Sequence, residues 1–272
     1  MNESPYLFET GAASDTGRVR NHNEDSFLVL PESGVWLVAD GMGGHHAGDF
    51  ASRAIAESAA SIGRPVSAPD LHARFMDRIL RAHQTIQAQS ARLNGATVGA
   101  TLVGLLSFDR HFACIWSGDS RIYLLRQGHY AQVTVDHTEV NELLRTGAIT
   151  PEQAHTWPRR NVITRAIGVH EMPMTDERSG ELVDGDTFLL CSDGLTEHVE
   201  DAEMADILMQ MTAQAACDAL VAMTLERGAK DNVTVVVVRC REQAAAQAMP
   251  EQYTAQPQYR PDDMGDEWTV GI

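Results

Sequence analysis

Ten residues, Val35–Gly44, constrain the fold of this chain more than any other stretch. An apolar run of β-forming residues leads there to Asp40, and the residues Gly-Met-Gly-Gly follow at once. A buried strand holds a carboxylate at its end in a fixed position, and the glycines after it allow backbone groups to approach whatever the carboxylate binds. The stretch therefore predicts a strand, a glycine-rich turn and a binding group in Asp40.

The same combination of strand, carboxylate and small residue recurs further along the chain. Asp193 lies in a Ser-Asp-Gly triplet after the apolar run 186–191, and Asp119 lies in a Gly-Asp-Ser triplet between two β-rich segments. Asp231 precedes the valine-rich run 233–240, so an antiparallel neighbour would bring it to the same sheet edge. A lone Asp-Gly is usually only a turn, whereas this recurrence favours a shared site.

The periodicity of apolar residues and the turn signals predict alternating strands and helices. Strands are expected at 26–30, 35–39, 99–108, 111–117, 121–125, 186–191 and 233–240. Helices are expected at 47–62, 69–93, 201–211 and 213–227. A Pro-Glu-Ser-Gly turn joins the first two strands into a hairpin. The polar, turn-rich residues 10–25 precede it, so Arg20, Glu24 and Asp25 are expected near Asp40 at matching sheet ends.

Residues 136–170 have a different character. Two helical fragments, 139–145 and 151–155, alternate there with Gly, Pro and polar residues. Long segments of this kind are often mobile and often carry function. We interpret the segment as a flap that leaves the core and lies over a site.

Length and charge limit the classes of protein. A chain of 272 residues can bury a full core, and it predicts one domain, 1–241, followed by an acidic, disordered tail, 242–272. The net charge of −17 argues against binding to nucleic acid or to an anionic membrane surface. No apolar run is long enough to span a bilayer, and no secretory signal is visible. The four cysteines form no CxxC pair, which predicts buried, reduced thiols in a cytoplasmic protein.

The recurring carboxylates suggest a metal site. Carboxylates that converge on one place repel each other unless a cation neutralises them. Oxygen ligands without Cys or His select hard divalent cations such as Mg²⁺ or Mn²⁺. Two such ions about 3.5–4 Å apart can activate a bridging water and hold a phosphoryl group. The alternative, in which each Asp only caps a turn or a helix, is weaker for a set of four to six.

These motifs resemble those of the metal-dependent protein phosphatases, the PP2C-like serine/threonine phosphatases, in their bacterial branch. The resemblance runs in the family's order over about residues 10–240. It is carried by Arg20-Asn-His-Asn-Glu24-Asp25, Val38-Ala-Asp40-Gly-Met-Gly-Gly44, Gly118-Asp-Ser-Arg121, Ser192-Asp-Gly194 and Asp231-Asn232. It implies an α+β fold, a four-layer α-β-β-α sandwich of two mainly antiparallel sheets, with a two-metal centre at one edge.

Roles follow by position within the resembling motifs. The metal ligands implied are Asp40, which bridges two Mn²⁺ or Mg²⁺ ions, the backbone carbonyl of Gly41, Asp193, Asp231, Glu24 through a water, and Asp119 for a third, weaker ion. Arg20 is expected to bind the substrate phosphate, a role that suits a guanidinium fork. Asp25 is expected to hold the metal ligands in position without binding a metal itself.

The resemblance leaves the general acid open. Met42 stands where the eukaryotic branch has a histidine, so His45 and His46 are the candidates here. A cysteine phosphatase is disfavoured, because Cys-x5-Arg would require arginine at position 120, whereas Arg121 follows Cys114 one residue too late.

The implied activity is hydrolysis of phosphoserine and phosphothreonine on proteins by direct attack of a hydroxide activated by two metals. The enzyme is expected to be a cytoplasmic monomer that opposes a bacterial Ser/Thr kinase. One alternative is a weak or inactive pseudophosphatase that binds phosphoproteins. Another is a phosphatase of an anti-sigma antagonist switch, although the sensory or coiled-coil domains usual in that branch are not visible.

Overall fold

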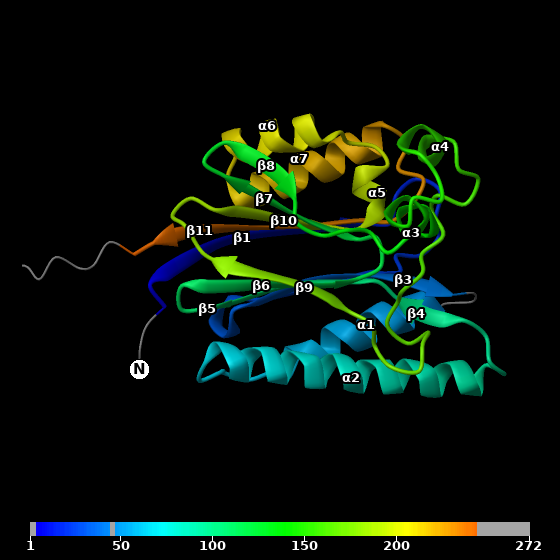
Figure 1. The fold of residues 1–272 in the computed structure, drawn as a ribbon. Coiled ribbons are helices and arrows are strands. Elements are labelled where there is room, and N and C mark those ends of the chain that lie inside the picture. Colours follow the sequence, from blue (N-terminus) through cyan, green and yellow to red (C-terminus); the bar gives the residue numbers. More distant parts are fainter. Residues whose placement is uncertain (1–3, 44–46, 244–272) are drawn as a thin grey trace, which may run out of the picture. The chain divides into compact units, whose positions relative to one another are not determined.

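The computed structural model describes residues 4–43 and 47–243. The described residues up to Glu242 belong to one compact unit, in which two sheets lie face to face (Figure 1). The first sheet has the order β1 (Tyr6–Asp15), β11 (Val233–Glu242), β10 (Thr187–Cys191), β7 (Arg121–Arg126) and β8 (His129–Gln132). The second has the order β2 (Asp25–Leu30), β3 (Val35–Gly43), β5 (Leu102–Phe108), β6 (His111–Ser117) and β9 (Asp176–Glu181), and β4 (Val98–Ala100) pairs with β3. All these pairings are antiparallel.

Helices cover the outer face of each sheet. The helices are α1 (Ala47–Ala60) and α2 (Ala68–Arg92) on the second sheet, α5 (Asp193–Thr196), α6 (Asp201–Gln210) and α7 (Ala213–Glu226) on the first, and α3 (Glu139–Arg145) and α4 (Pro151–His155) in the predicted flap (Figure 1). A one-turn 3-10 helix, Pro31–Ser33, connects β2 to β3. Ser67 caps α2 by accepting a hydrogen bond from the Asp70 amide, as expected for a serine before a helix.

Three apolar layers hold these elements together. One lies between α1, α2 and the second sheet, and another lies between α5–α7 and the first sheet. The third lies between the sheets, where Phe112 of β6 meets Phe188 of β10 edge to face with ring centroids 5.0 Å apart. The fold is thus the predicted four-layer α-β-β-α sandwich.

Most predicted elements are confirmed. The four long helices begin and end within two residues of the predicted positions, and α3 and α4 have the predicted bounds. The β2–β3 hairpin forms, and the four cysteines are free and buried. Within the described ranges, no helix is long and apolar enough to cross a membrane.

Four features of the strands differ from the sequence prediction. The polar stretch 10–25 contains most of β1, which is paired along its whole length with β11. Asp40 does not end its strand, because β3 continues to Gly43 and pairs there with β4. The segment 99–108 is interrupted at Thr101, while β8 and β9 had no strand signal strong enough to predict them.

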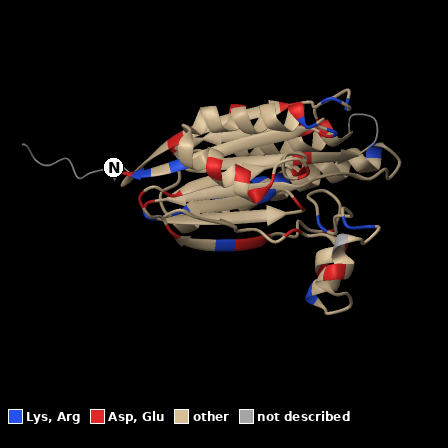
Figure 2. Ribbon diagram, turned by 90° about the horizontal axis from the view of Figure 1, so that it is seen from above, with Lys and Arg blue, Asp and Glu red and all other residues tan. Residues whose placement is uncertain are grey.

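Charged residues are distributed over the whole unit. Basic positions alternate with acidic ones on the face seen from above rather than forming one stripe (Figure 2). The tail predicted at 242–272 lies, after residue 243, outside the described residues.

Candidate metal centre

Asp25 and Asp40 lie opposite each other in the β2–β3 ladder. The pairing places two carboxylates at one end of the second sheet, where the hairpin meets the loop before β2. Asp25 is only 8% exposed, and its Oδ2 accepts a hydrogen bond of 2.8 Å from the Ser192 hydroxyl. Ser192 belongs to the segment between β10 and α5, so this bond joins the edges of the two sheets.

The backbone around Gly41 is packed so closely that it admits no side chain. The Gly41 amide donates to the Glu24 carbonyl at 3.0 Å. A Cβ at Gly41 would lie 2.1 Å from the carbonyl oxygen of Gly48 in α1, and a Cβ at Gly48 would lie 2.8 Å from the carboxyl carbon of Glu24. Glycine at both positions therefore lets β3, the loop and α1 meet backbone to backbone. The carboxylate of Glu24 is thereby brought against this end of β3.

Asp193 and Asp231 enter the centre from the first sheet. Asp193 is the first residue of α5 and directly follows Ser192, whose amide donates to the Thr234 carbonyl at 3.1 Å. Asp231 precedes β11, and the antiparallel pairing of β10 with β11 brings the two carboxylates to one edge, as predicted. Arg20 Nη2 lies 2.6 Å from Asp231 Oδ2.

Asn232 fixes the loop that carries Arg20 and Glu24. Its side-chain oxygen accepts from the Glu24 amide at 2.8 Å, and its side-chain nitrogen donates to the carbonyls of Thr16 and His22 at 2.8 and 2.9 Å. Asn232 is 5% exposed, so water does not replace these bonds readily. One amide side chain thus binds three backbone groups of the loop.

Asp119 is connected to Asp40 through two buried hydroxyls. The Asp40 amide donates to Thr101 Oγ1 at 3.0 Å, and the Thr101 hydroxyl lies 2.7 Å from the Ser120 hydroxyl. The Thr101 amide also donates to the Asp40 carbonyl at 2.8 Å. The interruption between β4 and β5 thus places Thr101 between the two acidic residues.

Burial and mutual repulsion raise the pKa values of these carboxyls. Loss of hydration is the largest cause in each case. The next cause is the charge of Asp25 for Asp40 and the charge of Asp193 for Asp119. For Asp25, hydrogen bonds partly compensate the rise, and the charge of Asp193 adds to it. The pKa rises to about 7 for Asp25 and Asp119 and to about 6 for Asp193, and that of Asp40 rises strongly. A nearby positive charge would reverse these shifts.

The donor set fits hard divalent cations by its chemistry. Its members are carboxylates, and the Oδ1 atoms of Asp25 and Asp193 are buried without a hydrogen-bond partner. Buried polar atoms normally have partners, so these two oxygens indicate that something is to be bound there. Within the described ranges, however, no three His, Cys, Asp or Glu side chains meet in a ready-made cage. The centre thus has the oxygen ligands that a divalent cation prefers, but in the described residues they are not yet gathered around one point.

The structure brings most of the predicted site residues to one place. The charges of Asp25, Asp119, Asp193 and Asp231 act on Asp40, and those of Asp231, Glu197 and Arg20 act on Asp193. His45 and His46 lie outside the described residues. The sequence analysis assigned no role to Ser192, Asn232, Thr101 or Ser120. Ser120, Ser192 and Asn232 stood inside recognised motifs, whereas nothing in the sequence marks Thr101.

The chain is similar in sequence to known proteins. The family model described as protein phosphatase 2C matches residues 17–247. The chain is 37% identical over 254 residues to the serine/threonine protein phosphatase PstP of Mycobacterium tuberculosis, an alignment that covers 92% of this chain and 48% of PstP. The chain therefore spans about half the length of that relative.

Solved structures agree over almost their whole length. PppA, described as a key regulatory component of T6SS in Pseudomonas aeruginosa, is 39% identical with a TM-score of 0.79, covering 86% of this chain and 97% of PppA. The catalytic domain of PstP in complex with two manganese ions is 35% identical with a TM-score of 0.76, covering 87% and 99%.

Proposed function

Because the chain belongs to the protein phosphatase 2C family, we propose that it hydrolyses phosphoserine and phosphothreonine side chains of proteins. The observation that carries the proposal is the cluster of carboxylates with raised pKa values around Asp40, with Arg20 at its rim. Such a cluster suits the binding of divalent cations, and a phosphate ester is the substrate that both cations and a guanidinium bind.

The residues of the centre divide the proposed binding tasks. The proposed ligands of two Mn²⁺ or Mg²⁺ ions are Asp40, the Gly41 carbonyl, Asp193, Asp231 and, through a water, Glu24, with Asp119 for a third, weaker ion. When bound, the cations supply Lewis-acid chemistry and lower the pKa of a water nucleophile. The PstP catalytic domain with its two manganese ions supports this assignment.

The chain's own groups position the substrate. Arg20 is half exposed, so its guanidinium can reach a phosphate that approaches from solvent. Asp25 accepts a hydrogen bond from Ser192 and lies opposite Asp40, so its carboxylate adds negative charge next to Asp40. The close backbone contact of Gly41 with Gly48 keeps side chains out of the space in which the Gly41 carbonyl would act.

The proton donor to the leaving alcohol belongs to the segment that follows β3. Met42 has no titratable group, and His45 and His46 are the nearest histidines in the sequence. We propose one of them as the general acid.

The wider setting is part of the same proposal. A monomeric, cytoplasmic phosphatase that opposes a Ser/Thr kinase is consistent with four free, buried thiols, which are stable in a reducing compartment. The pseudophosphatase and the anti-sigma antagonist switch remain the alternatives. Neither is favoured by a specific contact, since every proposed ligand residue is present in the sequence.

The test is hydrolysis of para-nitrophenyl phosphate and of a phosphothreonine peptide, with Mn²⁺ and then with excess EDTA. We expect turnover of both substrates with Mn²⁺ and none with EDTA. Absence of turnover, while calorimetry still records Mn²⁺ binding, would support the phosphoprotein-binding alternative. Absence of both would contradict the metal centre itself.

A further inference from the structure

The turn that carries Asp119 is tied to the base of the flap by His137. The His137 amide donates to the Gly118 carbonyl at 2.8 Å, and the Gly118 amide donates to His137 Nδ1 at 3.1 Å. One residue thus satisfies both backbone groups of the glycine that precedes Asp119. His137 is 6% exposed, so water competes weakly for these bonds.

The other contacts of His137 fix its ring and reach both ends of the flap. Because Nδ1 accepts a hydrogen bond, the ring proton lies on Nε2, which donates to Asp176 Oδ2 at 3.1 Å. The ring stacks on Trp116 at an interplanar angle of 15°. The Thr164 amide donates to the His137 carbonyl at 2.8 Å, so the end of the flap returns to the residue at which it begins.

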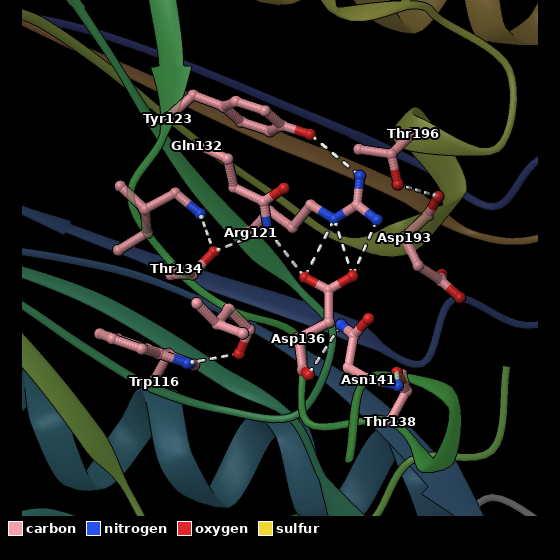
Figure 3. A network of polar contacts seen from close by, with 12 residues as sticks. Trp116, Arg121, Tyr123, Gln132, Thr134, Asp136, Thr138, Asn141, Asp193 and Thr196 are labelled. Carbon is pink, nitrogen blue, oxygen red and sulfur yellow. Dashed lines mark hydrogen bonds and ion pairs between the residues drawn. The ribbon is translucent and has the colours of Figure 1, made fainter. Parts of the chain in front are cut away.

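A second tie lies on the opposite side of Asp119. Arg121 donates to both carboxylate oxygens of Asp136, from Nε to Oδ1 at 3.1 Å and from Nη2 to Oδ2 at 2.8 Å (Figure 3). The Asp136 carbonyl accepts from Asn141 of α3 at 3.0 Å (Figure 3). Two adjacent residues at the base of the flap therefore bind the two ends of the turn: His137 binds Gly118, and Asp136 binds Arg121. Asp119 and Ser120 lie between these two contacts.

We propose that His137 is a positioning residue that fixes the Asp119 turn to the flap and thereby sets the affinity of Asp119 for a divalent cation. The inference rests on the proposed function. His137 touches neither cation nor substrate. Its effect is transmitted by the Gly118 backbone, because a carboxylate whose turn can shift loses the fixed placement that a cation requires.

Two substitutions separate the contacts of the ring. In His137→Asn the side-chain oxygen can take the place of Nδ1 and accept from the Gly118 amide, but it does not reach Asp176. In His137→Gln the side-chain amide can reach Asp176, but no acceptor remains for Gly118. His72→Gln is the matched control, because His72 forms a comparable pair with Glu177 at 2.8 Å on exposed side chains of α2 and β9.

The experiment combines amide hydrogen exchange of Gly118 in the metal-free protein with calorimetric titration of Mn²⁺. For His137→Gln we expect faster Gly118 exchange and a roughly tenfold weaker affinity at the weakest Mn²⁺ site. We expect His72→Gln to stay near wild type in both measurements. We expect His137→Asn, which keeps the bond to Gly118 but loses the bond to Asp176, to show only a small loss. Asp176→Ala removes the partner of Nε2 and also the ion pair of Asp176 with Arg165. It is expected to produce a loss smaller than that of His137→Gln, which keeps the test available if His137→Gln fails to fold.

The outcomes are distinguishable. Wild-type exchange and affinity in His137→Gln, or in Asp176→Ala where His137→Gln fails to fold, would overturn the role of His137. Equal losses in His137→Asn and His137→Gln would also overturn it, because ring packing rather than the bond to Gly118 would then be responsible. Failure of the wild-type protein to bind any Mn²⁺ would overturn the proposed function together with this inference.

Discussion

Arg20 and Asp231 form an ion pair across the candidate centre, with Arg20 Nη2 2.6 Å from Asp231 Oδ2. Their separation in the sequence is 211 residues, and the hydrogen bond to Asp231 is the largest cause that raises the pKa of Arg20. Both residues have proposed partners outside the chain, a phosphate for Arg20 and a cation for Asp231. A cation at Asp231 would compete with Arg20 and leave its guanidinium to the phosphate.

Replacement of Arg20 by lysine is therefore expected to weaken substrate binding more than turnover. Lysine keeps the charge but loses the planar fork that binds two phosphate oxygens. We expect KM for a phosphothreonine peptide to rise about tenfold and kcat to fall less, as measured by steady-state kinetics. Arg53→Lys, at an exposed pair with Asp49 in α1, is the control and should change neither constant. An unchanged KM in Arg20→Lys would exclude the phosphate role.

Asp193→Asn is expected to abolish activity without unfolding the protein. The substitution removes a proposed ligand but relieves the repulsion among buried carboxylates, so the metal-free protein should unfold at the same temperature or higher. Turnover of para-nitrophenyl phosphate should fall more than about 100-fold. Asp201→Asn, in the exposed first turn of α6, should leave turnover intact. Activity of Asp193→Asn within a few-fold of wild type would contradict the two-metal assignment.

The stability of the metal-free protein is expected to depend on pH through the same carboxyls. The pKa values of Asp25 and Asp119 are about 7 in the folded protein against an ordinary 3.8, so the folded state binds more protons than the unfolded state between these values. Their stabilising contribution is complete below pH ~4 and is lost as the pH rises through about 7.

Urea unfolding in EDTA between about pH 5 and about pH 8 measures this effect. Because histidines titrate in the same window, the comparison is with Asp119→Asn, whose unfolding free energy should fall less with rising pH. Addition of Mn²⁺ should stabilise wild type most at the upper end of the range. Parallel pH profiles for wild type and Asp119→Asn would show that Asp119 is not buried with a raised pKa.

Asn232→Ala is expected to release the loop that carries Arg20 and Glu24. It removes three hydrogen bonds to backbone groups of that loop, with an expected loss of about 2 kcal/mol in the free energy of unfolding. Chemical denaturation measures the loss, and Asn21→Ala, at an exposed position of the same loop, should have little effect. KM should rise as well, because Arg20 loses its fixed place. A variant as stable as wild type would show that other contacts hold the loop.

The repeated strand-and-carboxylate pattern was sufficient to predict the edge at which the acidic residues meet. The apolar faces of α1 and α2 made these helices predictable, because burial of one face decides where such helices form. Antiparallel pairing then accounted for Asp193 and Asp231 without further information.

Two failures came from tertiary contacts that a local pattern does not contain. Most of β1 lies in a polar stretch, and its partner β11 supplies ten paired residues from the other end of the chain. Gly41 and Gly43 suggested a turn after Asp40, yet they continue β3 because β4 pairs with them and α1 packs against Gly41. Glycine signals either a turn or a close backbone approach, and only the fold distinguishes these.

The supporting polar residues were harder to foresee. The hydroxyl oxygens of Thr101 and Ser120 lie 2.7 Å apart because the break between β4 and β5 meets the turn between β6 and β7. A single threonine between apolar residues has no local signature. The same holds for His137, whose partners Gly118 and Asp176 are 19 and 39 residues away. The roles of such side chains depend on contacts formed in the folded protein, so sequence periodicity does not predict them.

The pairing of β1 with β11 has a consequence for biosynthesis. Among the described strands of this domain, β1 is synthesised first and its partner β11 last. Pairing between such distant segments is slow to form, and it requires that nearly the whole domain has been made. Asp231 and Asn232 emerge at the same late stage. A nascent chain therefore contains no completed centre, and the site is assembled only when translation of the domain has finished.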